Sequence, residues 1–221
     1  MKRKSTLLTL LLALCLLLSG CSRSGNTNAN ISPTPEKPDA PITTPDKEEP
    51  PQQPEEEPIS ISHLTAELVV EMGDAERFLS RLGELSTLLQ QGLTQENCHV
   101  DDVTITISTA GGVTGDALAG GGVDVAFLPA VDYVTYEGSA LAVLTTDEEI
   151  CSMVVAVSAA REELDGAFCR ALEKALLETT EGSDFLELYQ PGITCIPATE
   201  EAIQAVRDWL AEQKSAEQEG Q

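Results

Sequence analysis

The sequence predicts an α/β fold, a single three-layer lobe in which a mostly parallel β-sheet is flanked by helices. Two observations predict it. Short runs of β-branched and other apolar residues alternate, along residues 61–214, with segments whose apolar residues recur at helical spacing. This alternation is typical of strands joined by crossover helices. Residues 123–128 also form an almost unbroken apolar run, as expected of a strand buried on both faces of a parallel sheet.

Six strands are expected in order along this part of the chain. The second shows the clearest period of two, because Val103, Ile105 and Ile107 alternate with Thr and Ser. The third ends at Pro129, which cannot continue a central strand. The expected strands are residues 66–70, 103–108, 123–128, 140–144, 152–157 and 193–196.

Six helices are expected between and after these strands. In the longest, Leu164, Phe168 and Leu172 recur on one helical face. Asp74 and Thr199 are expected N-caps, because short polar side chains accept hydrogen bonds from the free N–H groups of a first turn. The expected helices are residues 75–90, 113–119, 131–136, 161–179, 199–213 and a short one around 185–188.

The first 21 residues carry the pattern of an export signal. Basic residues at positions 2–4 precede an apolar run over 7–18, which is shorter than the roughly 20 residues of a spanning helix. Residues 18–21 read LSGC and resemble the bacterial lipobox, in which the cysteine is lipidated and begins the mature protein. An ordinary signal peptide with a chance cysteine is the alternative. The lipobox interpretation predicts attachment through Cys21 to the extracytoplasmic face of the cell membrane.

Residues 22–60 are rich in Pro, Glu, Thr, Asn and Ser. Such a segment buries too little apolar surface to fold, so a disordered tether is expected. Residues 61–214 are long enough for one domain and too short for two of ordinary size. Residues 215–221 then form a polar tail.

The domain is strongly acidic. Residues 61–221 contain seven Lys and Arg against 29 Asp and Glu, which leaves a formal charge of −22. This field repels nucleic acid and anionic lipid surfaces, so neither is an expected partner. Surface charges are screened beyond about 8 Å at physiological salt, and N–H groups at a helix start can still bind an oxyanion locally.

Candidate site residues follow the first three strands, because open α/β sheets bind ligands beyond the carboxyl ends of their strands. The loop over 108–112 offers backbone N–H groups for an oxyanion, although such a loop is more often only a tight turn. The segment 71–74 would better suit a cationic or amine ligand. Asp124 is expected to cap or pair locally. The candidate ligand-binding residues are Tyr133, Pro129, Ala130, Asp132, Ser108, Thr109 and Gly111.

Two stretches carry a family resemblance. Residues 120–134 read GGGVDVAFLPAVDYV, and residues 197–207 read PATEEAIQAVR. In this order they resemble the phosphonate/phosphite-type solute-binding proteins of ABC transporters, a branch of the type 2 periplasmic-binding fold. The resemblance covers most of residues 66–210. It implies a small polar, phosphonate-like ligand contacted by Tyr133, an ABC permease as partner, and binding without catalysis or a cofactor.

The chain departs from that family in one respect. Full-length members have two lobes with the ligand between them, but residues 145–150 leave no room for a second lobe. Half a cleft buries less of a ligand than the 70–90% typical of a closed site. Affinity should therefore be weak unless a partner or a dimer supplies the other wall.

Catalysis has little support in the sequence. The two histidines, His63 and His99, stand in no nucleophile–base pattern, and the pair at 98–99 lacks the spacing of a zinc site. Four of the six cysteines lie in the domain. In an exported domain they could form two disulfides or stay buried thiols, and both possibilities are open. They are Cys98, Cys151, Cys169 and Cys195.

Two functions follow. The first is a membrane-anchored solute-binding lipoprotein, part of an ABC uptake system for phosphonate-like or other small polar ligands. The alternative is a degenerate single lobe that serves as a protein-interaction or scaffold lipoprotein of the cell envelope. A solute-binding protein should be stabilised by a small ligand. An interaction module should instead expose an apolar patch where the second lobe would pack.

Overall fold

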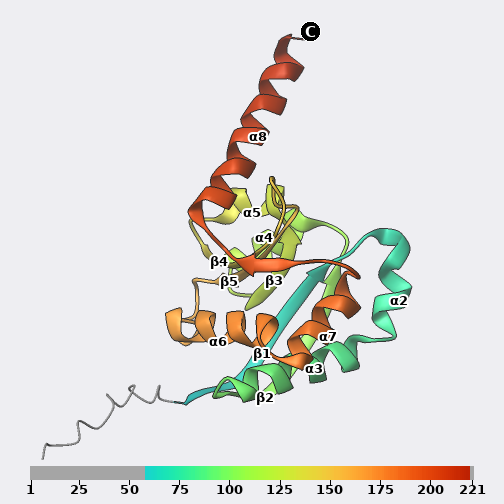
Figure 1. Ribbon diagram of the computed structural model, residues 1–221, viewed down its shortest axis with the longest axis vertical. Helices are drawn as coiled ribbons and strands as arrows, with labels where there is room; N and C mark the ends of the chain where they lie inside the picture. Colours follow the sequence, from blue (N-terminus) through green and yellow to red (C-terminus); the bar gives the residue numbers. More distant parts are fainter. Residues whose placement is uncertain (1–57, 220–221) are drawn as a thin grey trace, which may run out of the picture. The chain divides into compact units, whose positions relative to one another are not determined.

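The computed structural model describes residues 58–219, which form a six-stranded sheet with helices on both faces (Figure 1). The expected signal, Cys21 and most of the expected tether lie outside these residues. The strand order is β2-β1-β3-β5-β4-β6. The strands are β1 (Ile59–Val69), β2 (Cys98–Ser108), β3 (Val125–Pro129), β4 (Ala140–Thr146), β5 (Met153–Ser158) and β6 (Cys195–Pro197).

The sheet confirms the expected α/β fold and is mixed in direction. β1 pairs in parallel with β2 and with β3, whereas β5 is antiparallel to β3 and β4, and β6 is antiparallel to β4. The first four strands therefore run one way, and β5 and β6 run the other. Residues 147–152 join β4 directly to β5, and a short connection of this kind can only make an antiparallel hairpin.

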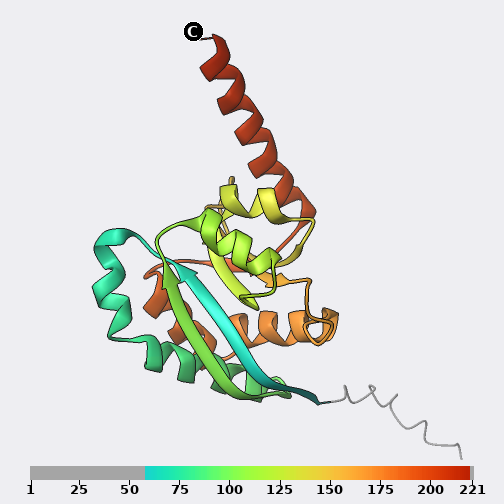
Figure 2. The ribbon, with the colours of Figure 1, turned by 180° about the vertical axis from the view of Figure 1, so that it is seen from behind.

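Helices cover both faces, so the fold has three layers (Figures 1 and 2). One face packs against α3, α6 and α7 in a cluster that includes Leu68, Phe127 and Phe168, and the other packs against α4, α5 and α8 around Leu128 and Val206. None of the helices between residues 58 and 219 combines the length and apolar character needed to cross a bilayer. The helices are α2 (Ala75–Leu79, after the 3₁₀ turn Met72–Asp74), α3 (Leu82–Gln95), α4 (Gly111–Ala119), α5 (Ala130–Tyr136), α6 (Gly166–Leu177), α7 (Thr180–Tyr189) and α8 (Glu200–Glu219).

Helix caps move one expected boundary. The helix expected over 161–179 begins only at Gly166, because the Asp165 carboxylate accepts hydrogen bonds from the N–H groups of Ala167 and Phe168. It ends at Leu177, and the Thr179 hydroxyl then caps a separate helix, α7, by accepting from the Gly182 N–H group at 2.9 Å. The predicted helix therefore extended past the end of α6 and included the N-cap residue of α7.

The other boundaries differ in the same local way. Asp74 was expected to cap a helix over 75–90, but it makes no capping bond, and that segment divides into α2 and α3 around residues 80–81. Thr199 does cap α8, since its hydroxyl accepts from the Ala202 N–H group at 3.1 Å. β1 and β2 begin at Ile59 and Cys98, earlier than expected. The two strands pair along their first residues, where polar residues interrupt the alternation of apolar and polar side chains on which the prediction relied.

Candidate binding surface at the carboxyl edge of the sheet

The carboxyl ends of β1, β2, β3 and β4 lie at one edge of the sheet, called here the carboxyl edge. Backbone hydrogen bonds connect the segments that follow these strands. The Val70 N–H group donates to the Ser108 carbonyl at 2.8 Å, and the Ala130 N–H group donates to the Ser152 carbonyl at 3.0 Å. The three loops that carry the candidate residues therefore gather at the edge where open α/β sheets bind ligands.

Large apolar side chains are exposed along this edge. Within residues 58–219, six large apolar residues are exposed, and four of them follow β1, β2, β3 and β4 in turn. Apolar residues exposed along one edge of a sheet are typical of an interaction surface, whereas scattered exposed residues are ordinary. The four are Met72 (80% exposed), Val113 (64%), Val131 (40%) and Ile150 (40%); the other two are Leu79 and Leu141.

Acidic residues occur in the same segments as these apolar residues. The Glu148 carboxylate accepts hydrogen bonds from the Ser152 N–H group at 3.1 Å and the Thr146 hydroxyl at 3.0 Å. Bonds from Ser152 and Thr146 lower the pKa of Glu148, so it stays ionised well into the acidic range. The acidic residues in the segments after β1, β3 and β4 are Glu71, Asp74, Asp132, Asp147, Glu148 and Glu149.

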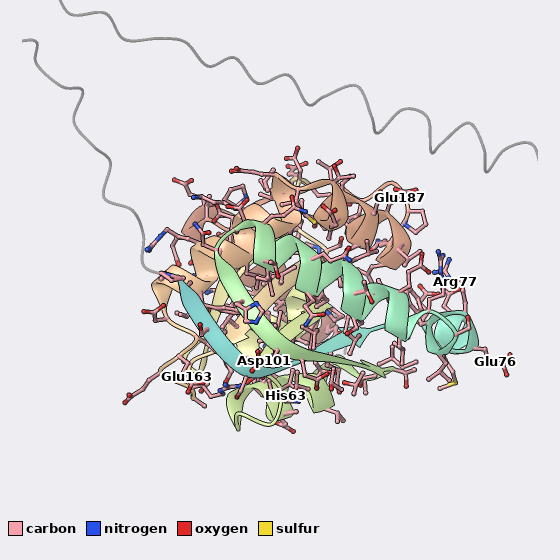
Figure 3. The ribbon with its side chains drawn as sticks, turned by 90° about the horizontal axis from the view of Figure 1, so that it is seen from below. His63, Glu76, Arg77, Asp101, Glu163 and Glu187 are labelled. Carbon is pink, nitrogen blue, oxygen red and sulfur yellow. The ribbon has the colours of Figure 1, made fainter. Side chains whose placement is uncertain are left out.

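A pocket of about 310 Å³ opens at the end of β1 and is called here the β1-end pocket. The Arg77 guanidinium lies over the Phe78 ring, 4.7 Å from its centroid, and its Nε is 3.6 Å from Asp74 Oδ1. Figure 3 shows Arg77 and Glu76 on α2 at one end of the domain and Glu163 toward the opposite end. The pocket is lined by Val69, Val70, Glu71, Asp74, Arg77, Phe78, Tyr189, Gln190 and Pro191.

Tyr133, the residue that the resemblance assigns to ligand contact, lies in the core. It is only 4% exposed, and its hydroxyl donates to the Ala140 carbonyl at 3.2 Å. Burial raises the pKa of Tyr133. The side chain also lines a shallow surface pocket of about 350 Å³ between α5, β4 and α8, which includes Glu137 and Arg207. Its hydroxyl is thus satisfied inside the chain.

Pro129 and Ala130 have structural roles at the carboxyl edge. Pro129 pairs with Met153 in the sheet and precedes the first turn of α5, while Ala130 is buried. Neither offers a polar side chain, and the Ala130 N–H group is already bonded to Ser152. These two residues shape the edge without supplying a free hydrogen-bonding group.

Asp132 occupies the start of α4, where the loop over 108–112 was expected to bind an oxyanion. A Cβ atom built on Gly111 would lie 1.9 Å from Asp132 Oδ2, so the carboxylate is packed against the glycine. The Ser108 hydroxyl accepts from the Ala110 N–H group at 3.2 Å, and Thr109 is exposed. A carboxylate suits the positive end of a helix and repels any second anion there. The structure thus brings these candidates together and gives the site an acidic character.

Asp124 was expected to cap or pair locally, and it pairs with groups that are distant in sequence. It is 4% exposed, its Oδ2 accepts from the Thr65 N–H group, and its Oδ1 lies 2.8 Å from the Arg161 guanidinium. Arg161 also donates to the His63 carbonyl. This ion pair links β1 and β3 to the segment before α6.

Sequence reasoning missed a hydrogen-bonded chain on β1 and β2. His63 Nδ1 lies 2.8 Å from Asp102 Oδ2, and its Nε2 lies 3.2 Å from Thr65 Oγ1, which is the order of groups in a nucleophile triad. The His63 and Asp102 side chains are 50% and 68% exposed, and Figure 2 shows no helix over this part of the two strands. Water reaches these groups, so we assign no reaction to them. Only the strand register, which places His63 opposite Asp102, could have revealed the chain.

The four domain cysteines are free thiols, so the two possible disulfides are not formed. Burial raises the pKa of Cys98 and of Cys195 to about 11, which keeps both protonated and unreactive at neutral pH. Within residues 58–219 no group of three or more His, Cys, Asp or Glu could hold a metal ion.

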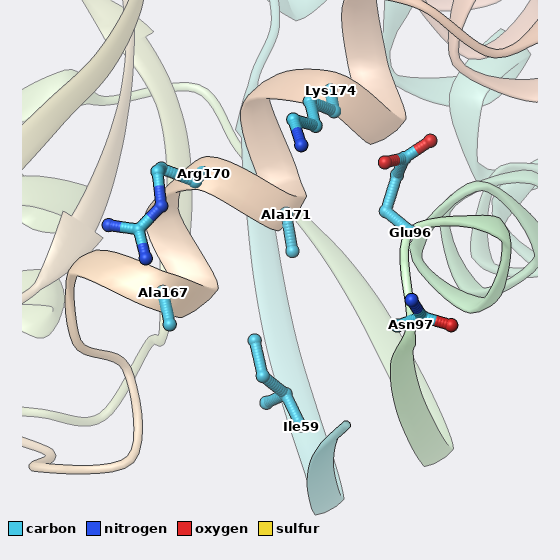
Figure 4. Close-up of a pocket in the computed structure, with 7 residues that line it drawn as sticks. All are labelled: Ile59, Glu96, Asn97, Ala167, Arg170, Ala171 and Lys174. Atoms are coloured by element: carbon cyan, nitrogen blue, oxygen red, sulfur yellow. The ribbon is translucent and has the colours of Figure 1, made fainter. Parts of the chain in front are cut away.

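A further pocket, of about 260 Å³, lies at the amino end of β1 (Figure 4). Ile59, Ala167 and Ala171 line it together with Arg170 and Lys174 from α6 and with the turn before β2. None of the candidate site residues lines this pocket. The residues expected to bind a ligand therefore lie away from this pocket.

The fold and this surface define a single α/β lobe with an open, acidic carboxyl edge. No protein-family model matches the chain, and no curated protein matches it. Similar solved structures include XAC2383 from Xanthomonas citri bound to chloride ion, with a TM-score of 0.53 and 10% identity over 71% of this chain and 99% of that chain. Another is XAC2383 bound to ATP, with a TM-score of 0.50 and 10% identity over 66% and 95%. At this identity the likeness concerns the fold alone.

Proposed function

We propose that the chain is a lipid-anchored lipoprotein of the cell envelope whose single lobe binds a protein partner through the carboxyl edge. The partner presents an apolar centre ringed by Lys and Arg. Anchoring through Cys21 rests on the lipobox pattern. The partner's chemistry rests on the residues of the edge.

One observation carries this proposal: the exposure of Met72, Val113, Val131 and Ile150 after four different strands. These residues are far apart in sequence, and the fold gathers their segments at one edge. Burying one Val or Ile side chain stabilises a complex by about 1.5–3 kcal/mol, so a few of them can anchor a partner. The carboxylates around them favour a basic rim on that partner.

An anionic solute fits this edge poorly. The Asp132 carboxylate packs against Gly111 at the start of α4, and the Tyr133 hydroxyl is bonded to Ala140. XAC2383 is described with chloride and with ATP, which are both anions. Because the likeness to XAC2383 concerns the fold alone, those ligands do not enter the proposal.

A second candidate function is solute binding in an ABC uptake system, as the family resemblance implies. The β1-end pocket favours it, because its volume of about 310 Å³ lies at the lower end of the range for small-molecule sites, about 300–1,000 Å³. Glu71 and Asp74 line this pocket, so its solute would be an amine rather than a phosphonate.

Site-directed photo-crosslinking tests the proposal. A photo-reactive amino acid at Thr109, which is exposed at the edge, should give a discrete adduct in cells that make the full chain. Val131→Ser and Ile150→Ser should each reduce the adduct about threefold to eightfold. Each side chain is 40% exposed, and burying that exposed part contributes about 0.6–1.2 kcal/mol. The adduct's protein should carry Lys and Arg around the cross-linked position, and reversing those charges should abolish the adduct.

Leu141→Ser is the matched control, because Leu141 is also an exposed apolar residue but lies near the amino end of β4. It should leave the adduct unchanged. Equal adducts from Val131→Ser, Ile150→Ser and Leu141→Ser would contradict the proposal. So would an equal adduct from a photo-reactive residue at Gln204, which is exposed on α8.

Thermal unfolding with anionic ligands tests the phosphonate-like solute that the family resemblance implies. A ligand at a hundredfold excess over its dissociation constant adds about 2.7 kcal/mol to the free energy of unfolding. We expect no shift with phosphate, phosphite or methylphosphonate. A shift with methylphosphonate that a second anion competes away would overturn partner docking in favour of solute capture.

A further inference from the structure

The β1-end pocket has a chemistry of its own within the carboxyl edge. Its inner wall is aromatic: Phe78 and Tyr189 are both buried, with ring centroids 6.0 Å apart. The Tyr189 hydroxyl donates to the Val69 carbonyl at 2.8 Å, which fixes the ring. Because the hydroxyl is already bonded, Tyr189 contributes an aromatic ring to this wall and no free donor.

The mouth of the pocket is charged. Glu71 and Asp74 line it with Arg77, so the lining carries a formal charge of −1. Arg77 is partnered, because it lies beside Asp74 and over the Phe78 ring. By contrast, no cation among residues 58–219 pairs with the exposed Glu71 carboxylate.

We propose that this pocket receives one Lys or Arg side chain of the partner, with its charged group beside Glu71 and its methylenes against Phe78 and Tyr189. One cation neutralises the net charge of the lining. Arg77 shows that these surroundings suit a cation, since its guanidinium lies over the Phe78 ring and beside the Asp74 carboxylate. The inference rests on the proposed function and names the anchor group that the partner inserts.

Model side chains test the pocket without the partner. N-acetyl-arginine methylamide and N-acetyl-lysine methylamide are titrated into the ¹⁵N-labelled full chain in detergent, and N-acetyl-norleucine methylamide serves as the uncharged control. Amide signals of Glu71, Asp74 and Gln190 should shift with both charged probes and stay in place with the norleucine probe. Equal shifts with the norleucine probe would overturn the proposal.

Three variants should change the affinity for the arginine probe in different directions. Glu71→Gln should weaken binding of the arginine probe at least threefold, because it removes the unpaired carboxylate. Arg77→Gln should tighten binding at least twofold, because the lining charge changes from −1 to −2. Glu76→Gln removes a neighbouring charge that does not line the pocket and should change affinity less than twofold. Equal effects of Glu71→Gln and Glu76→Gln would overturn the proposal, since only general attraction to an acidic surface would remain.

The combined outcomes separate this inference from the proposed function. If the edge cross-links to a partner and neither charged probe binds, the pocket is not the anchor site, although docking stands. If the charged probes bind and no adduct forms at the edge, the pocket is a site for free amines, and a partner's side chain is excluded as its occupant. If the probes bind and also displace the cross-linked partner, both proposals are supported.

Discussion

Asp132 and Tyr133 are adjacent in sequence and lie in different surroundings. The Tyr133 hydroxyl is bonded to the Ala140 carbonyl inside a buried cluster, while the Asp132 carboxylate packs against Gly111 at the edge. In a helix, successive side chains point about 100° apart, so one can be buried while the next remains at the surface. Single residues thus set the chemistry of the carboxyl edge. The Tyr133 hydroxyl is buried and cannot bind a ligand there, whereas the Asp132 carboxylate lies at the edge.

Thr145 and Thr146 allow a matched test at this scale. Both are buried, but Thr145 Oγ1 has no hydrogen-bond partner within residues 58–219, whereas Thr146 Oγ1 accepts from the Ser152 N–H group at 2.8 Å and donates to Glu148. Thr145→Val should therefore stabilise the fold by about 1–2 kcal/mol, because an unsatisfied buried hydroxyl is costly. Thr146→Val should destabilise it by about 1–3 kcal/mol, because its partners lose their bonds.

Urea unfolding of the two variants measures both changes in the free energy of unfolding. Valine keeps the β-branched shape in each case, so strand propensity and volume are matched. A loss of stability in Thr145→Val would show that the hydroxyl has a partner, such as a water molecule, that compensates for its burial.

At the scale of elements, two close approaches hold neighbouring helices of the same layer together. In the first, α7 meets α6 at Gly182, where an added Cβ would lie 2.0 Å from the Ala175 carbonyl oxygen. In the second, the ring of Tyr136 on α5 lies against Gly115 on α4, and its hydroxyl donates to the Gly112 carbonyl. Backbone carbonyls cannot move aside as side-chain ends can, so the α6–α7 contact requires glycine at 182.

A pair of Gly→Ala variants tests this contact. Gly182→Ala should destabilise the domain by about 1–3 kcal/mol through overpacking. Gly83→Ala in α3 should stabilise it by about 0.5–1 kcal/mol, because nothing lies within 4 Å of an added Cβ there and alanine is the better helix former. Melting temperatures that change in the same direction for both variants would contradict the close approach.

At the scale of the whole molecule, charge opposes folding. The excess of carboxylates over residues 61–221, a formal charge of −22, repels itself in the compact state. A few ion pairs act in the opposite direction, among them Arg161 with Asp124 and Arg207 with Glu137. The side chains of these arginines are partly buried, at 28% exposure, so salt weakens these pairs less than it weakens the repulsion between fully exposed carboxylates.

Salt should therefore raise the melting temperature of this protein. From 0.1 M to 1 M sodium chloride the screening length falls from about 10 Å to about 3 Å, which removes most repulsion between surface carboxylates. We expect an increase of several degrees in a thermal unfolding series at neutral pH, with sucrose as an uncharged control. A lower melting temperature in salt would mean that the ion pairs outweigh the repulsion.

Much of the fold follows from local pattern. The six strands and most helices were predictable, because apolar period and cap residues such as Thr199 act over a few neighbouring residues. Boundaries set by a cap inside a longer pattern, as at Asp165 and Thr179, were not. The reversed direction of β5 was also not predicted, although the short connection over residues 147–152 requires it once β4 and β5 pair.

The candidate site divides in the same manner. The sequence by itself determined that loops after the first three strands would meet at one edge, and that the domain would be acidic, because strand order and composition are written along the chain. Only the tertiary structure decided that Tyr133 is buried and that Asp132 fills the start of α4. It alone decided that Met72, Val113, Val131 and Ile150 gather at one exposed edge. The physical reason is that these properties depend on contacts between residues distant in sequence, which local propensity does not encode.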